Sequence, residues 1–251
     1  MPSTAERMLT VRGLPTYVET SGAGPALLYL HGAAEWVGYS SELVHRLDQA
    51  HRVIQPERRG HGRTADPPGV LSYDEMTGDT IALIEQLGLD RPPIVGFSDG
   101  AIIALQIARM RPDLPGKVVA IGPNVSVSGM TDEALRWLES VTPDTWPEEF
   151  ARRHRALSPD GPEHWPVFAQ KVIDMLRVEP EIPLEELAAI RVPVLVMGAD
   201  HDLIRLEHLV EIHRAIEGSR LCIIPGAGHE LTVEAPELVA GMVERFLAEA
   251  D

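Results

Sequence analysis

Short runs of mainly apolar residues recur along this chain and predict buried β-strands. Five of them lie at 26–30, 52–55, 117–121, 194–197 and 221–224, and a sixth stands directly before Gly96. Runs of this length without alternation are typical of strands that are covered on both faces of a sheet. Residues 8–20 predict two further short strands around the turn Gly13-Leu14-Pro15. The pattern therefore predicts eight strands.

Between these runs, apolar positions recur at helical spacing. The predicted helices lie at 39–47, 73–87, 98–110, 206–216 and 236–248. Strands that alternate with helices favour a doubly wound, mostly parallel sheet with right-handed crossovers. The predicted fold class is therefore α/β.

The alternation stops between 124 and 187, where no buried strand is predicted and prolines are frequent. Helical spacing is found there at 131–140 and 168–176. Five of the twelve Phe, Trp and Tyr residues of the chain fall in this segment: Trp137, Trp146, Phe150, Trp165 and Phe168. We expect a helical lid at 124–187, inserted after the sixth strand into a core made of 1–123 and 188–251. The alternative is that these aromatic side chains only attach the segment to the core.

The composition is that of a soluble globular protein with an acidic balance. With 251 residues, the chain is long enough for one large α/β domain with an insertion. The formal net charge of -16 opposes binding to nucleic acid or to an anionic membrane surface, because both carry negative charge. No apolar run approaches the roughly 20 residues that span a bilayer, and residues 1–12 lack the apolar core of a signal peptide. We therefore expect a cytoplasmic protein that acts on a small-molecule substrate, and we leave open whether it forms a homo-oligomer.

The most specific chemical motif is Gly96-Phe97-Ser98-Asp99-Gly100. An apolar run precedes it and apolar residues at helical spacing follow it, so the serine falls on a sharp turn between a strand and a helix. Glycine at the two outer positions lets neighbouring backbone pass without a Cβ clash. The helix N-terminus offers free N–H groups beside the hydroxyl, where an oxyanion would form. Ser98 is therefore the candidate nucleophile.

A serine hydroxyl needs a base within hydrogen-bonding distance and a third group that orients this base. In an α/β sheet such partners collect after the carboxyl ends of strands. Of ten histidines, four follow predicted strands: His31, His61, His201 and His229. His229 stands in a glycine-rich loop directly after the strand that ends at Ile224, and we predict that it is the base.

Two aspartates follow the strand 194–197, in Gly198-Ala199-Asp200-His201-Asp202. Either satisfies the order nucleophile, acid, histidine along the chain. One of them serves equally well as a helix cap, since aspartate after a strand commonly caps the next helix. The residues alone leave Asp200 and Asp202 as alternatives for the acid.

Five motifs in this order resemble those of the α/β-hydrolase superfamily, in particular its small lidded members. They are His31-Gly32 after the third strand, Arg59-Gly60-His61-Gly62 after the fourth, the motif at 96–100, the segment 198–202, and Gly228-His229. The resemblance covers nearly the whole chain. It implies the α/β-hydrolase fold, and it assigns the acid to Asp202, with Asp200 as the fallback.

In this superfamily two backbone N–H groups form the oxyanion hole, one after the nucleophile and one just after the His-Gly pair. The resemblance places them at Asp99 and Ala33, with Ala34 as a one-residue alternative. Because only the backbone is used, alanine fits the role. His31 then shapes the loop rather than acting as a base.

The resemblance implies acyl transfer in two stages. Ser98 attacks a carbonyl while His229 takes its proton, and water activated by His229 then releases the acid. Serine at position 98 disfavours dehalogenase and epoxide-hydrolase chemistry, for which an aspartate stands at the elbow in this family. We therefore expect hydrolysis of a small carboxylic ester or lactone. Three alternatives stay open: C–C bond hydrolysis of a dienoic diketone, a perhydrolase that uses peroxide, and a non-catalytic ligand-binding receptor.

Aromatic residues near these motifs indicate a partly apolar substrate pocket. Its expected lining is Trp36, Phe97, Trp137, Trp146 and Trp165. We expect no cofactor. A metal site built from His201, His208 and His213 is disfavoured, because their spacing matches no standard zinc pattern, so no metal is expected.

Glu230 departs from the superfamily pattern, because an aromatic or apolar residue commonly follows the catalytic histidine. A carboxylate beside the base raises the pKa of that base or binds a polar group of the substrate. The alternative is a side chain that points to solvent. The role of Glu230 stays open at this point.

Overall fold

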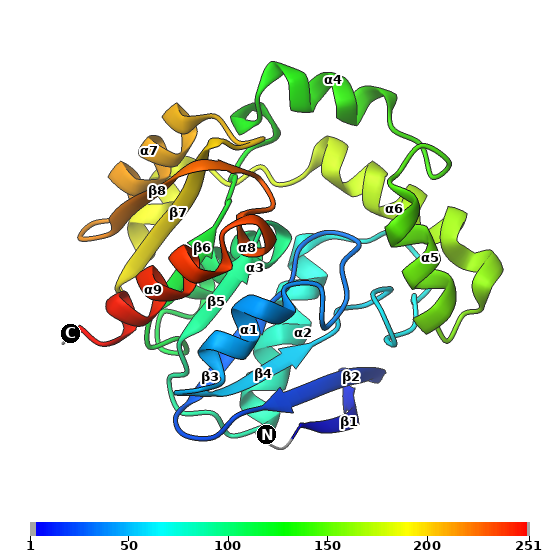
Figure 1. The fold of residues 1–251 in the computed structure, drawn as a ribbon, viewed down its shortest axis with the longest axis horizontal. Coiled ribbons are helices and arrows are strands. Elements are labelled where there is room, and N and C mark those ends of the chain that lie inside the picture. Colours follow the sequence, from blue (N-terminus) through cyan, green and yellow to red (C-terminus); the bar gives the residue numbers. More distant parts are fainter. Residues whose placement is uncertain (1–3, 250–251) are drawn as a thin grey trace.

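The computed structural model of the chain describes residues 4–249 (Figure 1). It contains one eight-stranded sheet with the strand order β1-β2-β4-β3-β5-β6-β7-β8. The strands are β1 Ala5–Val11, β2 Leu14–Ser21, β3 Ala26–Leu30, β4 Arg52–Pro56, β5 Ile94–Phe97, β6 Val118–Ile121, β7 Val194–His201 and β8 Arg220–Gly228. The predicted α/β class with eight strands is confirmed. Residues 1–3 and 250–251, the outer ends of the expected core, lie outside the described residues.

The sheet is antiparallel at one edge and parallel elsewhere. β1 pairs with β2, and β2 with β4, in antiparallel register. All pairs from β4 through β3, β5, β6 and β7 to β8 are parallel. Every residue of β5 and β6 is buried, as expected of central strands that are covered on both faces. The carboxyl ends of the parallel strands therefore share one edge of the sheet.

Helices cover both faces of this sheet (Figure 1). On one face pack α1 Ser41–Leu47, α8 Leu231–Glu234 and α9 Pro236–Leu247, and on the other α2 Tyr73–Gln86, α3 Asp99–Met110 and α7 Leu206–Ala215. Each face has its own apolar cluster. Because successive strand residues point to opposite faces, Ile94 joins one cluster and Val95 the other. Within residues 4–249, no helix is both long and apolar enough to cross a membrane.

Between β6 and β7 the chain forms helices in place of strands. They are α4 Asp132–Ser140, α5 Glu148–Leu157 and α6 Trp165–Val178, with 3-10 helices at Val127–Gly129, Pro162–His164 and Leu184–Ala189. Figure 1 shows α4 at the top of the view, and α6 and α5 along its upper and right-hand side. The side chain of Thr131 caps α4 by accepting the N–H of Ala134 at 3.2 Å. Leu138 and Phe168 belong to the same apolar cluster as α3, so the inserted helices pack directly on the core.

Strands β7 and β8 extend farther than the predicted runs 194–197 and 221–224. Their pairing continues past Ala199 to His201 and Gly228, with an irregularity between Ala199 and His201. The apolar pattern ends early because backbone pairing, rather than side-chain burial, holds this outer part together. The extension carries His229 to the edge of the sheet where Ser98 lies.

Candidate active site

Ser98 lies on a strained turn between β5 and α3. Its φ of 51° and ψ of -116° fall in a region that residues other than glycine rarely adopt. The N–H of Ser98 donates to the carbonyl of Ile121 at 2.8 Å, which holds the turn against β6. A Cβ at Gly96 would overlap the carbonyl oxygen of Gly100, and a Cβ at Gly100 would overlap that of Leu30. Both flanking positions therefore require glycine.

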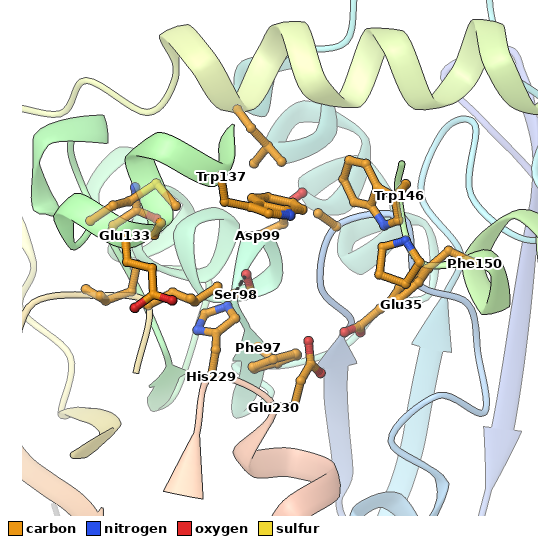
Figure 2. Close-up of a pocket in the computed structure, with 18 of the residues that line it drawn as sticks. Glu35, Phe97, Ser98, Asp99, Glu133, Trp137, Trp146, Phe150, His229 and Glu230 are labelled. Carbon is orange, nitrogen blue, oxygen red and sulfur yellow. Dashed lines mark hydrogen bonds between the residues drawn. The ribbon is translucent and has the colours of Figure 1, made fainter. Parts of the chain in front are cut away.

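His229 comes directly after β8 and faces Ser98 across the site (Figure 2). Its Nε2 lies 3.0 Å from Oγ of Ser98, and its Nδ1 lies 2.6 Å from Oδ1 of Asp202. Because an ionised carboxylate only accepts hydrogen bonds, we assign the proton to Nδ1, which leaves Nε2 to accept from the serine hydroxyl. The structure brings these three side chains into one hydrogen-bonded chain.

The two candidate acids occupy different environments. Asp202 is buried, and its carboxylate also accepts the N–H groups of Ala199 at 3.3 Å and Ile204 at 3.1 Å. These contacts fix the carboxylate in the direction of His229. Asp200 is exposed, and its Oδ1 accepts the N–H of Gly226 at 2.7 Å. The structure therefore brings Asp202, and not Asp200, to the histidine.

The surroundings of His229 favour its charged form. Burial alone would lower the pKa of the imidazole, but the hydrogen bond and negative charge of Asp202 act in the opposite direction. Glu230 and Asp99 add further negative charge nearby. The net result raises the pKa of His229 above its ordinary value.

Some backbone N–H groups near Ser98 already donate a hydrogen bond within the protein, and others do not. Ala33 and Asp99 line the same cavity as Ser98. In the described part of the chain, neither of their N–H groups donates to a protein acceptor. The N–H of Ala34 donates to Nε2 of His61 at 3.2 Å, so the one-residue alternative is engaged within the loop. Ala33 and Asp99 thus remain available to a ligand.

The site opens into a cavity of about 390 Å³ (Figure 2). Phe97, Trp137 and Trp146 line it, as expected. Helices of the inserted segment supply one wall, and the loops after β3, β5, β7 and β8 supply the rest. A mostly apolar cavity with a few polar groups beside a nucleophile is typical of a small-molecule site.

Trp36 and Trp165 do not line this cavity, which differs from the expectation. Trp165 is 1% exposed, and its Nε1 donates to the carbonyl of Pro143 at 3.0 Å, so it joins the inserted segment to itself. Trp36 is buried against Phe150, with the guanidinium of Arg153 over its ring. Both side chains are buried in packing contacts and are not among the described residues that line the cavity.

Several acidic and apolar residues of the lining escaped the sequence analysis. Glu35 follows Ala33 by two positions, and its charge in an otherwise small and apolar loop is the signal that would have found it. Glu133 and Phe150 come from α4 and α5, and their placement depends on how these helices lie over the core. No local pattern predicts that placement.

Asp99 has a second feature besides its N–H group. Its carboxylate is buried, accepts the hydroxyl of Tyr73 at 2.8 Å and lies 3.8 Å from the guanidinium of Arg58. Arg58 also donates to the carbonyls of His31 and Gly32. The ion pair therefore connects the start of α3 to the loop that carries Ala33.

The three histidines considered for a metal are not gathered at one point. Nε2 of His208 accepts the N–H of Val125 at 3.1 Å, and Nδ1 of His213 lies 2.8 Å from the hydroxyl of Ser219. His201 is exposed at the end of β7. Among residues 4–249 there is no group of three or more His, Cys, Asp or Glu side chains that could hold a metal ion.

The sheet order and the turn at Ser98 are those of an α/β-hydrolase fold. A family model described as the alpha/beta hydrolase family matches residues 27–242. The chain belongs to the alpha/beta hydrolase family.

Known relatives differ in what they act on. Epoxide hydrolase 2 of Siraitia grosvenorii is 36% identical over 108 residues, which cover 42% of this chain and 34% of that protein. The match thus spans only about a third of the length of this relative. A crystal structure of a serine hydrolase involved in carbazole degradation has a TM-score of 0.80 at 23% identity and covers 98% of this chain and 99% of that one. The enol-lactonase from Burkholderia xenovorans LB400 has a TM-score of 0.78 at 20% identity and covers 97% of this chain and 100% of that one. At these identities the two structures show a shared fold alone.

Proposed function

We propose that this protein is a serine hydrolase that cleaves a small carboxylic ester or lactone. One observation carries the proposal: Ser98, His229 and Asp202 form a hydrogen-bonded chain at the wall of a cavity. The unengaged N–H groups of Ala33 and Asp99 at the same cavity support it. Nucleophile, base, orienting acid and oxyanion donors are the parts that acyl transfer requires.

In the proposed reaction, Oγ of Ser98 attacks the substrate carbonyl and Nε2 of His229 takes the hydroxyl proton. The carbonyl oxygen becomes an oxyanion, which the N–H groups of Ala33 and Asp99 stabilise. The leaving alkoxide receives the proton from His229, and an acyl group remains on Ser98. Water then gives a proton to His229 and attacks the acyl group, which releases the carboxylic acid and restores Ser98. Asp202 stabilises the imidazolium in both stages.

We further propose that residues 124–187 act as a lid over this reaction. Trp137 on α4, Trp146 before α5 and Phe150 on α5 line the cavity opposite the core. Their apolar surface would exclude water from the acyl group and select substrates by shape. Residues of the lid and of the core would thus form the walls of the cavity together.

Two other chemistries receive less support from the site. Serine at the turn, in place of aspartate, disfavours the epoxide-opening reaction named for the plant relatives. The dienoic diketone considered for C–C bond hydrolysis carries a carboxylate, which a cationic side chain would bind. No lysine or arginine occurs among the described residues that line the cavity, so an anionic substrate would meet repulsion there.

Steady turnover of p-nitrophenyl acetate tests the proposal. We expect the wild-type protein to release p-nitrophenol continuously and Ser98→Ala to reduce the rate to the background of the buffer. A ligand-binding receptor of the same fold would instead show no turnover across a panel of esters and lactones. Turnover that persists in Ser98→Ala would overturn the assignment of the nucleophile.

A further inference from the structure

Two carboxyl groups that the proposed reaction does not use face the cavity beside its reacting atoms. Glu35 belongs to the loop after β3, and Glu230 directly follows His229. Figure 2 shows both side chains turned toward the cavity, with their carboxyl groups next to each other in this view. In this view Glu230 lies next to His229, and Glu35 lies beyond it.

Glu35 has one oxygen that is left without a partner. Its side chain is only 3% exposed, and Oε2 accepts the N–H of Gly32 at 2.6 Å. The hydrogen bonds found among residues 4–249 include none to Oε1. Glu35 borders the cavity, so Oε1 keeps a hydrogen-bonding position that is free of protein donors. A donor group on a ligand would occupy this position.

Neither carboxyl group forms an ion pair with a lysine or arginine of the described chain, although the charge of the more distant Arg58 acts on Glu35. Oε2 of Glu230 accepts the hydroxyl of Tyr39 at 3.0 Å, which is a neutral partner. In the described part of the chain, no ion pair involves Glu35 or Glu230. Asp99 is different, because Arg58 lies 3.8 Å from its carboxylate. Glu133 and Glu179 also line the cavity and form no ion pair in the described part of the chain, but Glu35 and Glu230 are the two whose carboxyl groups lie next to each other in Figure 2.

Burial and mutual repulsion disfavour ionisation of this pair. Burial raises the pKa of Glu35 well above its ordinary value and the negative charge of Glu230 raises it further, while the hydrogen bond from Gly32 and the charge of Arg58 act in the opposite direction. Burial also raises the pKa of Glu230, although His229 acts in the opposite direction. A bound cation would favour the charged form of both groups. Both carboxyl groups would therefore stabilise a cation that binds in the cavity.

The wall beside the pair suits such a cation as well. Phe150 and Trp146 line the cavity and lie 6.2 Å apart between ring centroids at a steep angle. Aromatic faces attract ammonium groups, and they also pack against the alkyl chain that carries one. The absence of lysine and arginine from the described lining removes any competitor.

We propose that Glu35 and Glu230 bind a positively charged group of the substrate, so that the enzyme acts on esters or lactones that carry an amine or a quaternary ammonium group. That the bound cation is part of a substrate rests on the proposed hydrolase function. Binding of the cation depends only on the cavity, so it can be measured without turnover.

The kinetic test compares esters of the same shape and different charge. On the acyl side, the p-nitrophenyl esters of 6-aminohexanoate, heptanoate and adipate present an ammonium, a methyl and a carboxylate group at the same place. On the alcohol side, acetylthiocholine is compared with the neutral 3,3-dimethylbutyl thioacetate. We expect kcat/KM of the cationic ester to exceed that of its neutral match by about tenfold or more in at least one set, and the anionic ester to be the poorest.

Two substitutions test whether the carboxyl pair causes the preference for cationic over neutral esters. Glu35→Gln keeps an acceptor for the N–H of Gly32, and Glu230→Gln keeps one for Tyr39, so both retain the local hydrogen bonds. In the double variant, the ratio of kcat/KM between cationic and neutral esters is expected to fall to near one. Glu207→Gln, at an exposed residue on α7, removes one negative charge, as each of the two single variants does, and should leave the ratio as in the wild type.

Calorimetric titration of Ser98→Ala with hexylammonium, 1-hexanol and hexanoate measures binding without turnover. Hexylammonium should bind at least about tenfold more tightly than the other two, and this preference should disappear when Glu35→Gln and Glu230→Gln are added. Equal binding of all three, or equal kcat/KM within both ester sets, would overturn the proposal. Ester turnover that survives Ser98→Ala would instead overturn the proposed function and leave the binding result to decide the cation site.

Discussion

The Nδ1 atom of His229 lies 2.6 Å from Oδ1 of Asp202. Two residues earlier, Asp200 accepts the N–H of Gly226 at the exposed end of the sheet. The outer pairing of β7 with β8 brings these segments together, because His201 and Gly228 are partners in the ladder. The same extension thus positions the base, orients one aspartate toward it and employs the other in the scaffold.

This division of roles predicts different outcomes for two similar substitutions. Asp202→Asn should lower kcat for p-nitrophenyl acetate by about 10³- to 10⁴-fold, because it removes the charge that orients the imidazole and stabilises the imidazolium. Asp200→Asn keeps an oxygen for Gly226 and should stay within about threefold of the wild type, since its charge is solvated. Steady-state kinetics of both variants check this. Near-wild-type activity in Asp202→Asn would contradict the assignment of the acid.

The pH dependence of ester hydrolysis should report the raised pKa of His229. Activity needs the neutral imidazole, so kcat/KM should rise with pH and level off only above the ordinary pKa of histidine. Glu230→Gln removes a negative charge that raises this pKa, and the rising limb should therefore move to lower pH. A pH profile on a neutral ester measures the shift, with Glu207→Gln as the control. An unchanged profile in Glu230→Gln would show that Glu230 does not act on the base.

Substitution of a glycine that flanks Ser98 should lower the free energy of unfolding strongly. At Gly100 a Cβ meets the backbone of Leu30, which cannot move without the sheet. Gly100→Ala should lower the free energy of unfolding by about 3 kcal/mol or more. Gly241, exposed within α9, has nothing within 4 Å of an added Cβ. Gly241→Ala should stabilise the protein by about 0.5–1 kcal/mol, and urea unfolding of both variants distinguishes the two cases.

Substitutions of two tryptophans of the inserted segment should have different effects, one on stability and the other on substrate binding. Trp165 is 1% exposed, and Trp165→Ala should lower the free energy of unfolding by about 3–5 kcal/mol. Trp137 is 39% exposed and lines the cavity, so Trp137→Ala should mainly raise KM for apolar esters. Thermal unfolding and kinetics on esters of increasing acyl length measure the two effects. A larger stability loss in Trp137→Ala than in Trp165→Ala would contradict this placement.

Most of the sheet follows from the sequence because central parallel strands are buried on both faces. Such strands appear as uninterrupted apolar runs, and β5 and β6 are examples. The motif around Ser98 is equally local, since the turn itself requires glycine at fixed positions. By contrast, the polar outer ends of β7 and β8 are held by backbone pairing, which leaves no apolar pattern.

The inserted helices show why the cavity lining was harder to predict. Trp137 and Trp165 both occupy amphipathic helices, and the sequence does not say which helix face meets the cavity and which meets another helix. Glu35 was overlooked for a different reason. Its charge stands out in a small and apolar loop, but its placement beside Glu230 requires the loop after β3 to meet the loop after β8, and this contact between distant segments has no local signal.

The central claim, that Ser98 is the nucleophile of an acyl-transfer reaction, is tested most directly by covalent labelling. The protein is treated with p-nitrophenyl diethyl phosphate, and the site of modification is located by mass spectrometry of its peptides. We expect one diethylphosphoryl group, attached to Ser98, with loss of ester turnover in proportion to labelling and no labelling in Ser98→Ala. Turnover that persists in the fully labelled protein, or a label on another residue with Ser98 unmodified, would contradict the claim.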